Sequence, residues 1–172
     1  IWTEQSKMLA AQGDNGARFG WSVAIDGDVA LIGAPFDDSP LGLSAGSAYV
    51  FERDGVAWTQ RFRFLDSEAS LGDHVGAGVA LSGYTAVITA PGDDSETEQN
   101  TGAAHVLVRN GMQWDSQAKL IPNEGAWLDH FTGPVALAGD VVVLGGQSSI
   151  SPGSTGEAAF VFRRLGGLWR QQ

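Results

Sequence analysis

The sequence predicts an all-β fold made of three similar four-stranded antiparallel sheets. Three observations support this prediction. Tryptophans recur at nearly constant intervals, at positions 2, 58, 114 and 169. Short alternating apolar runs flank turns that contain glycine, and no segment carries the apolar period of a helix. Regular recurrence of one supersecondary unit is the mark of a repeat architecture.

Each repeat reads as two hairpins. In the first repeat, strands are expected at 22–26 and 28–34, joined by a tight primed turn at Asp26-Gly27. A third strand at 48–53 turns through Asp54-Gly55 into a fourth that starts near Trp58. Glycine recurs at the matching turns of the later repeats, as Gly83, Gly111 and Gly139. The longer polar segments, such as 36–45, 66–74 and 147–155, are expected to be loops.

These repeats predict a single β-propeller-type domain over residues 1–172. A lone four-stranded sheet cannot bury both of its faces, so repeated sheets stack as blades. We expect an outer strand and linking loop at 1–18, a first blade at 19–74 and a second at 75–130. The third blade, 131–172, has a truncated outer strand. Propellers usually close with four to eight blades, so three predict either a homo-oligomer or part of a longer propeller chain.

The residues that recur resemble the FG-GAP repeat family, which includes the propeller blades of integrin α-subunits and of many bacterial surface and secreted proteins. Phe19-Gly20 is followed by Gly33-Ala34-Pro35, then by "GSAYVF" and "WTQ". The resemblance is strong in the first repeat and weakest in the third, where Thr132 departs from the pattern. It implies a non-catalytic binding or scaffold module for protein interaction or adhesion, located outside the cell or on its surface.

The resemblance also raises the question of calcium, which integrin-type repeats often hold in an Asp-rich loop between Phe-Gly and Gly-Ala-Pro. Here that interval contains only two short strands and the turn Asp26-Gly27-Asp28. Six or more oxygen ligands cannot converge on so short a turn. We therefore expect the family's calcium loop to be absent, and we predict no metal site and no cofactor; weak calcium binding by the 92–102 loop stays open.

Composition narrows the possible partners. The formal net charge is −10, with 20 acidic residues against 10 Lys and Arg, which argues against nucleic acid. The sequence has no apolar run long enough to span a membrane. It also has no recognisable nucleophile elbow, metalloprotease motif or phosphate loop, so we expect no catalytic residues and no enzyme activity.

Strand alternation places all the long loops on one face of the blades, and that face is expected to bind the partner. More than half of the acidic residues lie in these loops, so we expect the face to be acidic. The candidate ligand-binding carboxylates are Asp37, Asp38, Asp93 and Asp94.

Two tryptophans are also candidates for ligand binding. Trp21 and Trp127 have small, polar or aliphatic residues at the matching positions of the other repeats. A sugar ring could stack on either one, so a glycan-binding propeller is the alternative to a protein-binding one. Trp58, Trp114 and Trp169 recur at one position and are expected to pack between blades.

Overall fold

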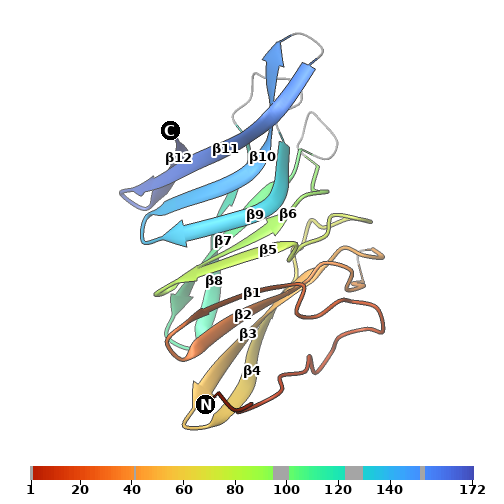
Figure 1. Cartoon of the computed structure of the whole chain (residues 1–172), viewed down its shortest axis with the longest axis vertical. Coiled ribbons are helices and arrows are strands. Elements are labelled where there is room, and N and C mark those ends of the chain that lie inside the picture. The colour runs from red at the N-terminus through yellow and green to blue at the C-terminus, as the bar shows by residue number, and fades with distance from the viewer. Residues whose placement is uncertain (1, 41, 95–100, 123–129, 152–153) are drawn as a thin grey trace.

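The computed structural model describes residues 2–40, 42–94, 101–122, 130–151 and 154–172. Every regular element in these ranges is a strand (Figure 1). The strands are β1 (Ser22–Asp26), β2 (Val29–Ala34), β3 (Ser47–Asp54), β4 (Ala57–Phe64), β5 (Gly78–Ser82), β6 (Thr85–Ala90), β7 (Ala103–Asn110), β8 (Gln113–Leu120), β9 (His130–Ala138), β10 (Val141–Ser151), β11 (Ser154–Leu165) and β12 (Leu168–Gln171). None of the described residues forms a helix that could cross a membrane.

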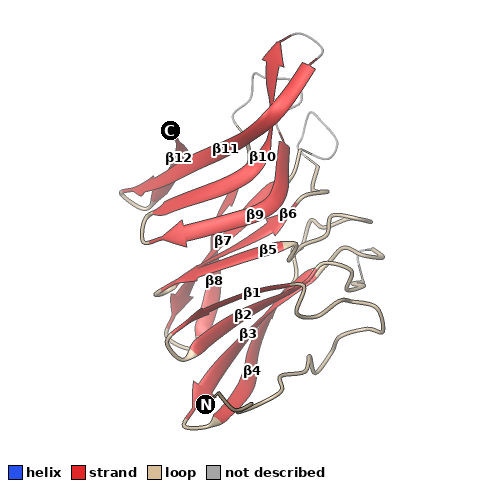
Figure 2. Cartoon of the chain, viewed as in Figure 1, coloured by secondary structure: helices blue, strands red, loops and turns tan. Residues whose placement is uncertain are grey.

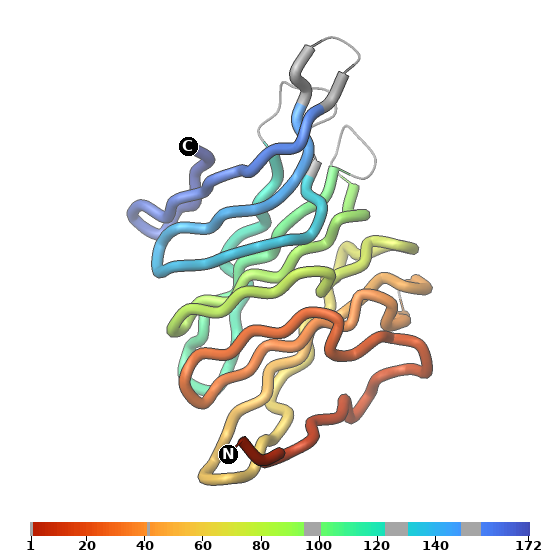
Figure 3. The backbone as a smooth tube through the Cα atoms, viewed as in Figure 1, coloured from red at the N-terminus to blue at the C-terminus, as the bar shows by residue number. Residues whose placement is uncertain are grey.

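The strands make three separate four-stranded antiparallel sheets. The orders are β1-β2-β3-β4, β5-β6-β7-β8 and β9-β10-β11-β12. The predicted all-β class and the three-blade organisation are therefore confirmed. The sheets follow one another along the long axis of the molecule and do not close into a ring (Figure 3).

In the first two blades the short turns lie on one side of the stack and the long loops on the other, as predicted (Figure 2). The loop expected at 147–155 is mostly strand instead, because β10 and β11 continue their pairing beyond Gln147. The structure corrects the position of the tight turns by one residue. Asp26 pairs with Val29, so the two turn residues are Gly27 and Asp28. Gly27 has φ 57°, and Asp28 has no positive φ. A glycine with positive φ at the first central position is typical of a type II′ turn, whereas a type I′ turn needs positive φ at both positions.

Stacking of the blades buries an apolar cluster between each neighbouring pair. Leu31 of the first sheet and Ile88 of the second are fully or almost fully buried in one cluster. Val87 and Leu144 belong to the cluster between the second and third sheets. Trp114 lies in the first of these clusters and Trp169 packs against the second, in agreement with their expected role between blades. The same expectation is wrong for Trp58, which packs on the far face of the first sheet, where no other blade lies among the described residues.

The far face of the first sheet is covered by the segment that precedes it. Ile32, Tyr49 and Phe51 pack there with Phe19, and Met8 and other residues of the segment join the same cluster. The outer strand predicted within 1–18 is not present, because residues 2–10 have no strand conformation. Within the described residues this segment pairs with no strand of the three sheets, and it packs on the first sheet through side chains such as Met8.

Adjacent blades approach closely along their inner strands. The Ser22 hydroxyl donates to the carbonyl oxygen of Gly76, 2.8 Å away, across the first junction. The Thr89 hydroxyl donates to the carbonyl oxygen of Gly133, also at 2.8 Å, across the second. In the first sheet Ser22 pairs with Gly33, and in the second Gly78 pairs with Thr89. The residue with the hydroxyl is on the first strand of the first blade but on the second strand of the second blade. In both blades its paired residue is a glycine.

Candidate functional site

An apolar pocket of about 400 Å³ opens where the inner strands meet the long loops. All three blades contribute to it: Trp21 just before β1, Ala77 just before β5, and Gly133 within β9. The lining residues are Trp21, Pro35, Phe36, His74, Ala77, Pro91, Thr132, Gly133 and Pro134.

The repeat pattern explains why a pocket forms here. Trp21, Ala77 and Gly133 hold equivalent positions in the three repeats. One large side chain beside two very small ones leaves a hollow that three tryptophans would fill. Pro35 and Pro91 are also equivalent, and each follows the second strand of its blade. The pocket is therefore a consequence of sequence differences between otherwise similar blades.

Aromatic and cationic contacts hold the Trp21 side of the pocket. The Trp21 and Phe36 rings meet edge to face with centroids 6.0 Å apart, and the Arg18 guanidinium lies 4.3 Å from the Phe36 centroid. The same guanidinium is 5.2 Å from the Trp21 ring. His74 donates from Nδ1 to the Pro35 carbonyl oxygen at 3.1 Å. Trp21 nevertheless remains 55% exposed, so its ring is accessible to a ligand.

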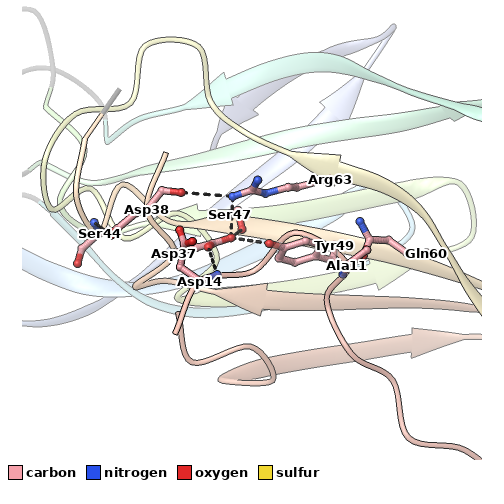
Figure 4. A network of polar contacts seen from close by, with 9 residues as sticks. All are labelled: Ala11, Asp14, Asp37, Asp38, Ser44, Ser47, Tyr49, Gln60 and Arg63. Atoms are coloured by element: carbon pink, nitrogen blue, oxygen red, sulfur yellow. Dashed lines mark hydrogen bonds and ion pairs between the residues drawn. The ribbon is translucent and has the colours of Figure 1, made fainter. Parts of the chain in front are cut away.

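A buried polar network lies in the loop that follows β2 (Figure 4). Asp37 is fully buried, and its Oδ2 accepts hydrogen bonds from the hydroxyls of Ser47 and Tyr49, each at 2.5 Å. Arg63 donates to the same oxygen at 2.9 Å, and the backbone amide of Asp14 donates to Oδ1 at 3.3 Å. This carboxylate therefore joins β3, β4 and two loops of the first blade.

The chemistry of the network fits a structural role. Burial raises the pKa of Tyr49 to about 12, and its hydrogen bond to Asp37 adds to the shift. Tyr49 thus remains a hydroxyl donor. Asp37 does not face solvent, and it forms an ion pair with Arg63. A buried carboxylate with this many donors is stable where an unpaired one would not be.

A related cluster occurs in the second blade. Asp93 is 4% exposed, and its Oδ1 lies 2.9 Å from Nζ of Lys119. Burial raises the pKa of Asp93, but contacts with His105 and Lys119 outweigh this and hold that pKa below its usual value. Burial lowers the pKa of Lys119, but Asp93 and neighbouring carboxylates outweigh it and raise that pKa. Both groups therefore stay charged near neutral pH.

The structure separates the predicted site residues. Trp21 lies in the pocket, Asp94 is exposed, and Asp38 is half-buried, with its Oδ1 accepting from the Ser44 amide at 2.8 Å. Asp37 and Asp93 are buried and paired, which corrects the expectation that they face a partner. Trp127 lies outside the described residues, as does most of the 92–102 loop.

The acidic character of the long-loop face is also weaker than expected. Asp66 and Asp73 are buried as well as Asp37 and Asp93. Burial raises the pKa of Asp73, which accepts hydrogen bonds from the amide and hydroxyl of Ser70. Loop carboxylates here serve as buried hydrogen-bond acceptors, a role that loop composition by itself does not reveal.

Sequence reasoning missed most of the pocket. The sequence did not indicate that Pro35, Phe36, His74, Pro91 and Pro134 line a pocket, although Pro35 belongs to the Gly33-Ala34-Pro35 motif. A signal for them exists, because Pro35 and Pro91 recur after the second strand of their repeats and flank the position of Trp21 in the fold.

The fold and the repeated sheets define a β-propeller-type repeat protein. A family model described as the FG-GAP repeat matches residues 2–51, 58–107 and 114–162. The chain therefore belongs to the FG-GAP repeat family. Each match begins at a recurring tryptophan. One sequence repeat therefore starts at the position of the outer strand of one blade and continues through the first three strands of the next blade. A search of curated proteins finds no match.

Proposed function

We propose that this protein is a non-catalytic binding module, acting outside the cell or on its surface, that receives an apolar side chain of a protein partner in the pocket beside Trp21. The observation that carries the proposal is a concave apolar site with a half-exposed tryptophan at its edge. Exposed tryptophans beside pockets are the residues that most often dominate binding energy at interfaces. Membership of a family that typically serves binding and adhesion supports the same assignment.

A protein ligand fits this pocket better than a glycan. The lining offers few polar side chains, chiefly the Thr132 hydroxyl and His74, whose Nδ1 is already bonded to Pro35. A buried sugar hydroxyl without a partner costs about 1–3 kcal/mol, so sugar recognition requires several well-placed polar groups. The proline, phenylalanine and tryptophan side chains of the lining instead suit contact with an apolar or aromatic side chain of a partner.

The test is a parallel screen of the protein against a phage-displayed peptide library and a glycan array. We expect selected peptides to carry an apolar residue, and Trp21→Ala to weaken their binding by at least about 10-fold, as truncation of a buried interface anchor does. The matched control is Leu43→Ala, which alters another exposed apolar residue, 65% exposed, that does not line the pocket. Trp21-dependent glycan binding without peptide binding would favour the alternative. Binding by neither probe, or binding unaffected by Trp21→Ala, would overturn the proposal.

We further propose that the far face of the third sheet packs against a blade of a second copy of this chain. Val143 there is 38% exposed, although its repeat equivalents Leu31 and Val87 are completely buried by the next blade. Val143 also pairs with Val161 and Ala136, so the face is apolar beyond one residue.

Sedimentation velocity measures this packing directly. We expect a particle larger than one chain, reduced to a monomer by Val143→Glu, because an unpaired charge in an apolar interface is costly. Val56→Glu is the control, since Val56 is 74% exposed in the β3–β4 turn. A folded monomer at every concentration would contradict self-association.

A further inference from the structure

The first and second blades contain the same polar cluster with different side chains. In both, a carboxylate that follows the second strand contacts a residue of the third strand and a cation of the fourth. The equivalent pairs are Asp37 and Asp93, Ser47 and Ala103, Tyr49 and His105, Arg63 and Lys119, and Ala10 and Asp66. The first blade thus serves as an internal reference for the second.

The substitutions remove hydrogen-bond donors and add acceptors. In the first blade two hydroxyls and a guanidinium satisfy Asp37 Oδ2. In the second, alanine replaces the serine, histidine replaces the tyrosine, and Asp66 adds another carboxylate. Within the described part of the chain, Asp93 Oδ2, Asp66 Oδ2 and His105 Nε2 have no hydrogen-bond partner, although all three side chains are at least nine-tenths buried. Buried polar atoms without partners call for an explanation.

These three atoms face one another at distances that suit a metal ion. Nε2 of His105 lies 3.4 Å from Oδ2 of Asp66 and 3.5 Å from Oδ2 of Asp93. One ligand atom from each of the three residues falls within 4.8 Å of the others. Tetrahedral zinc binds nitrogen and oxygen at about 2.0–2.2 Å, which separates neighbouring ligand atoms by about 3.3–3.6 Å. The separations are longer than the about 2.7–2.9 Å of a charge-assisted hydrogen bond.

Lys119 leaves the potential ligand atoms available. Its Nζ bonds Asp93 through Oδ1, the other oxygen of the carboxylate, and lies 3.6 Å from Glu68 Oε2. It is 3.9 Å from Asp66 Oδ2, beyond hydrogen-bond distance. Lys119 therefore contacts the Asp93 oxygen that does not face the histidine, whereas in the first blade Arg63 and Tyr49 share one oxygen of Asp37.

We propose that Asp66, Asp93 and His105 form a binding site for a divalent transition-metal ion of the zinc class, with a fourth position open to water. An imidazole with two carboxylates suits such an ion better than calcium, which prefers six to eight oxygen ligands. Asp66 lies in the segment after β4 of the first blade, whereas Asp93 and His105 belong to the second. The ion cross-links the segment that follows β4 to the second blade.

Metal titration of the whole chain tests the site. We expect one Zn²⁺ per chain by calorimetry and, with Co²⁺ as a probe, a visible absorption band of tetrahedral type. Zinc at about 100 times its dissociation constant should raise Tm by about 5–10 °C, and a chelator should reverse the rise.

The first blade supplies the variants. His105→Tyr and Asp66→Ala introduce the residues found at the equivalent positions of that blade, so both are expected to fold. Each should weaken metal binding by at least about 100-fold, since loss even of a supporting outer group costs 10–100-fold. Asp115→Asn, which alters an exposed carboxylate of β8, should bind as the unmodified chain does.

Two results would overturn the assignment. Absence of stoichiometric binding by Zn²⁺ and Co²⁺ would mean that the three side chains form a polar cluster without a metal. Binding that persists in both His105→Tyr and Asp66→Ala would place the metal elsewhere. Neither result bears on the pocket beside Trp21, because the cluster shares no residue with its lining.

Discussion

Replacing Asp37 by alanine is expected to destabilise the protein by about 3–5 kcal/mol, the cost of removing one partner from a buried ion pair. The Arg63 side chain is only 17% exposed and would lose its counter-charge, and the hydroxyls of Ser47 and Tyr49 would lose their acceptor. For a chain of this size, each kcal/mol lowers Tm by about 2–4 °C. Urea denaturation followed by tryptophan fluorescence measures the change.

The control for Asp37→Ala is Asp28→Ala. Asp28 also accepts from an arginine, Arg53, but its side chain is 65% exposed. An ion pair in water contributes about 0–1 kcal/mol, so this variant should remain close to the unmodified protein. Equal effects of the two substitutions would contradict the view that burial makes Asp37 essential to the first blade.

Gly33→Thr is expected to cost about 3 kcal/mol, at the upper end for an overfilled interior, because backbone occupies the space. A Cβ at Gly33 would lie 2.0 Å from the carbonyl oxygen of Gly76 and 2.3 Å from Oγ of Ser22. The clash arises at the junction between the first two blades. Thermal unfolding should therefore show a lower Tm.

The second blade indicates how to reverse this effect. There the equivalent pair is Gly78 and Thr89, with the hydroxyl on the other strand. The double variant Ser22→Gly, Gly33→Thr copies that arrangement and should recover at least about half of the lost stability. Val23→Thr is the control, because it places a threonine in the same hairpin at a position that is 68% exposed. A double variant no more stable than Gly33→Thr would show that the two positions are not coupled.

Much of the fold could be predicted from local patterns. Alternating apolar residues in 22–26 and 29–34, with a glycine between them, define a hairpin whatever surrounds it. The tryptophan spacing then places the same unit in the second and third repeats. The turn position was wrong by one residue because glycine can serve at either central position of a two-residue turn, and only the pairing of Asp26 with Val29 selects one.

The site was less predictable, and the four candidate carboxylates illustrate why. Asp37 and Asp38 are adjacent and chemically identical, yet Asp37 is fully buried while Asp38 is only partly so. They differ because Tyr49 of β3 and Arg63 of β4, both distant in sequence, donate hydrogen bonds to the Asp37 carboxylate. Trp21 was recognisable because its repeat equivalents are small, but two of the prolines that complete its pocket, Pro91 and Pro134, come from other blades.

The strands, the three repeats and the membership of the family follow from the order of neighbouring residues and from a period, so they could be predicted without coordinates. The burial of particular loop carboxylates, the place of the pocket, and the meeting of Asp66, Asp93 and His105 became evident from the packed structure. Those features depend on the way one sheet packs against the next. Contacts between blades join residues far apart in the chain, and no local pattern records their distance.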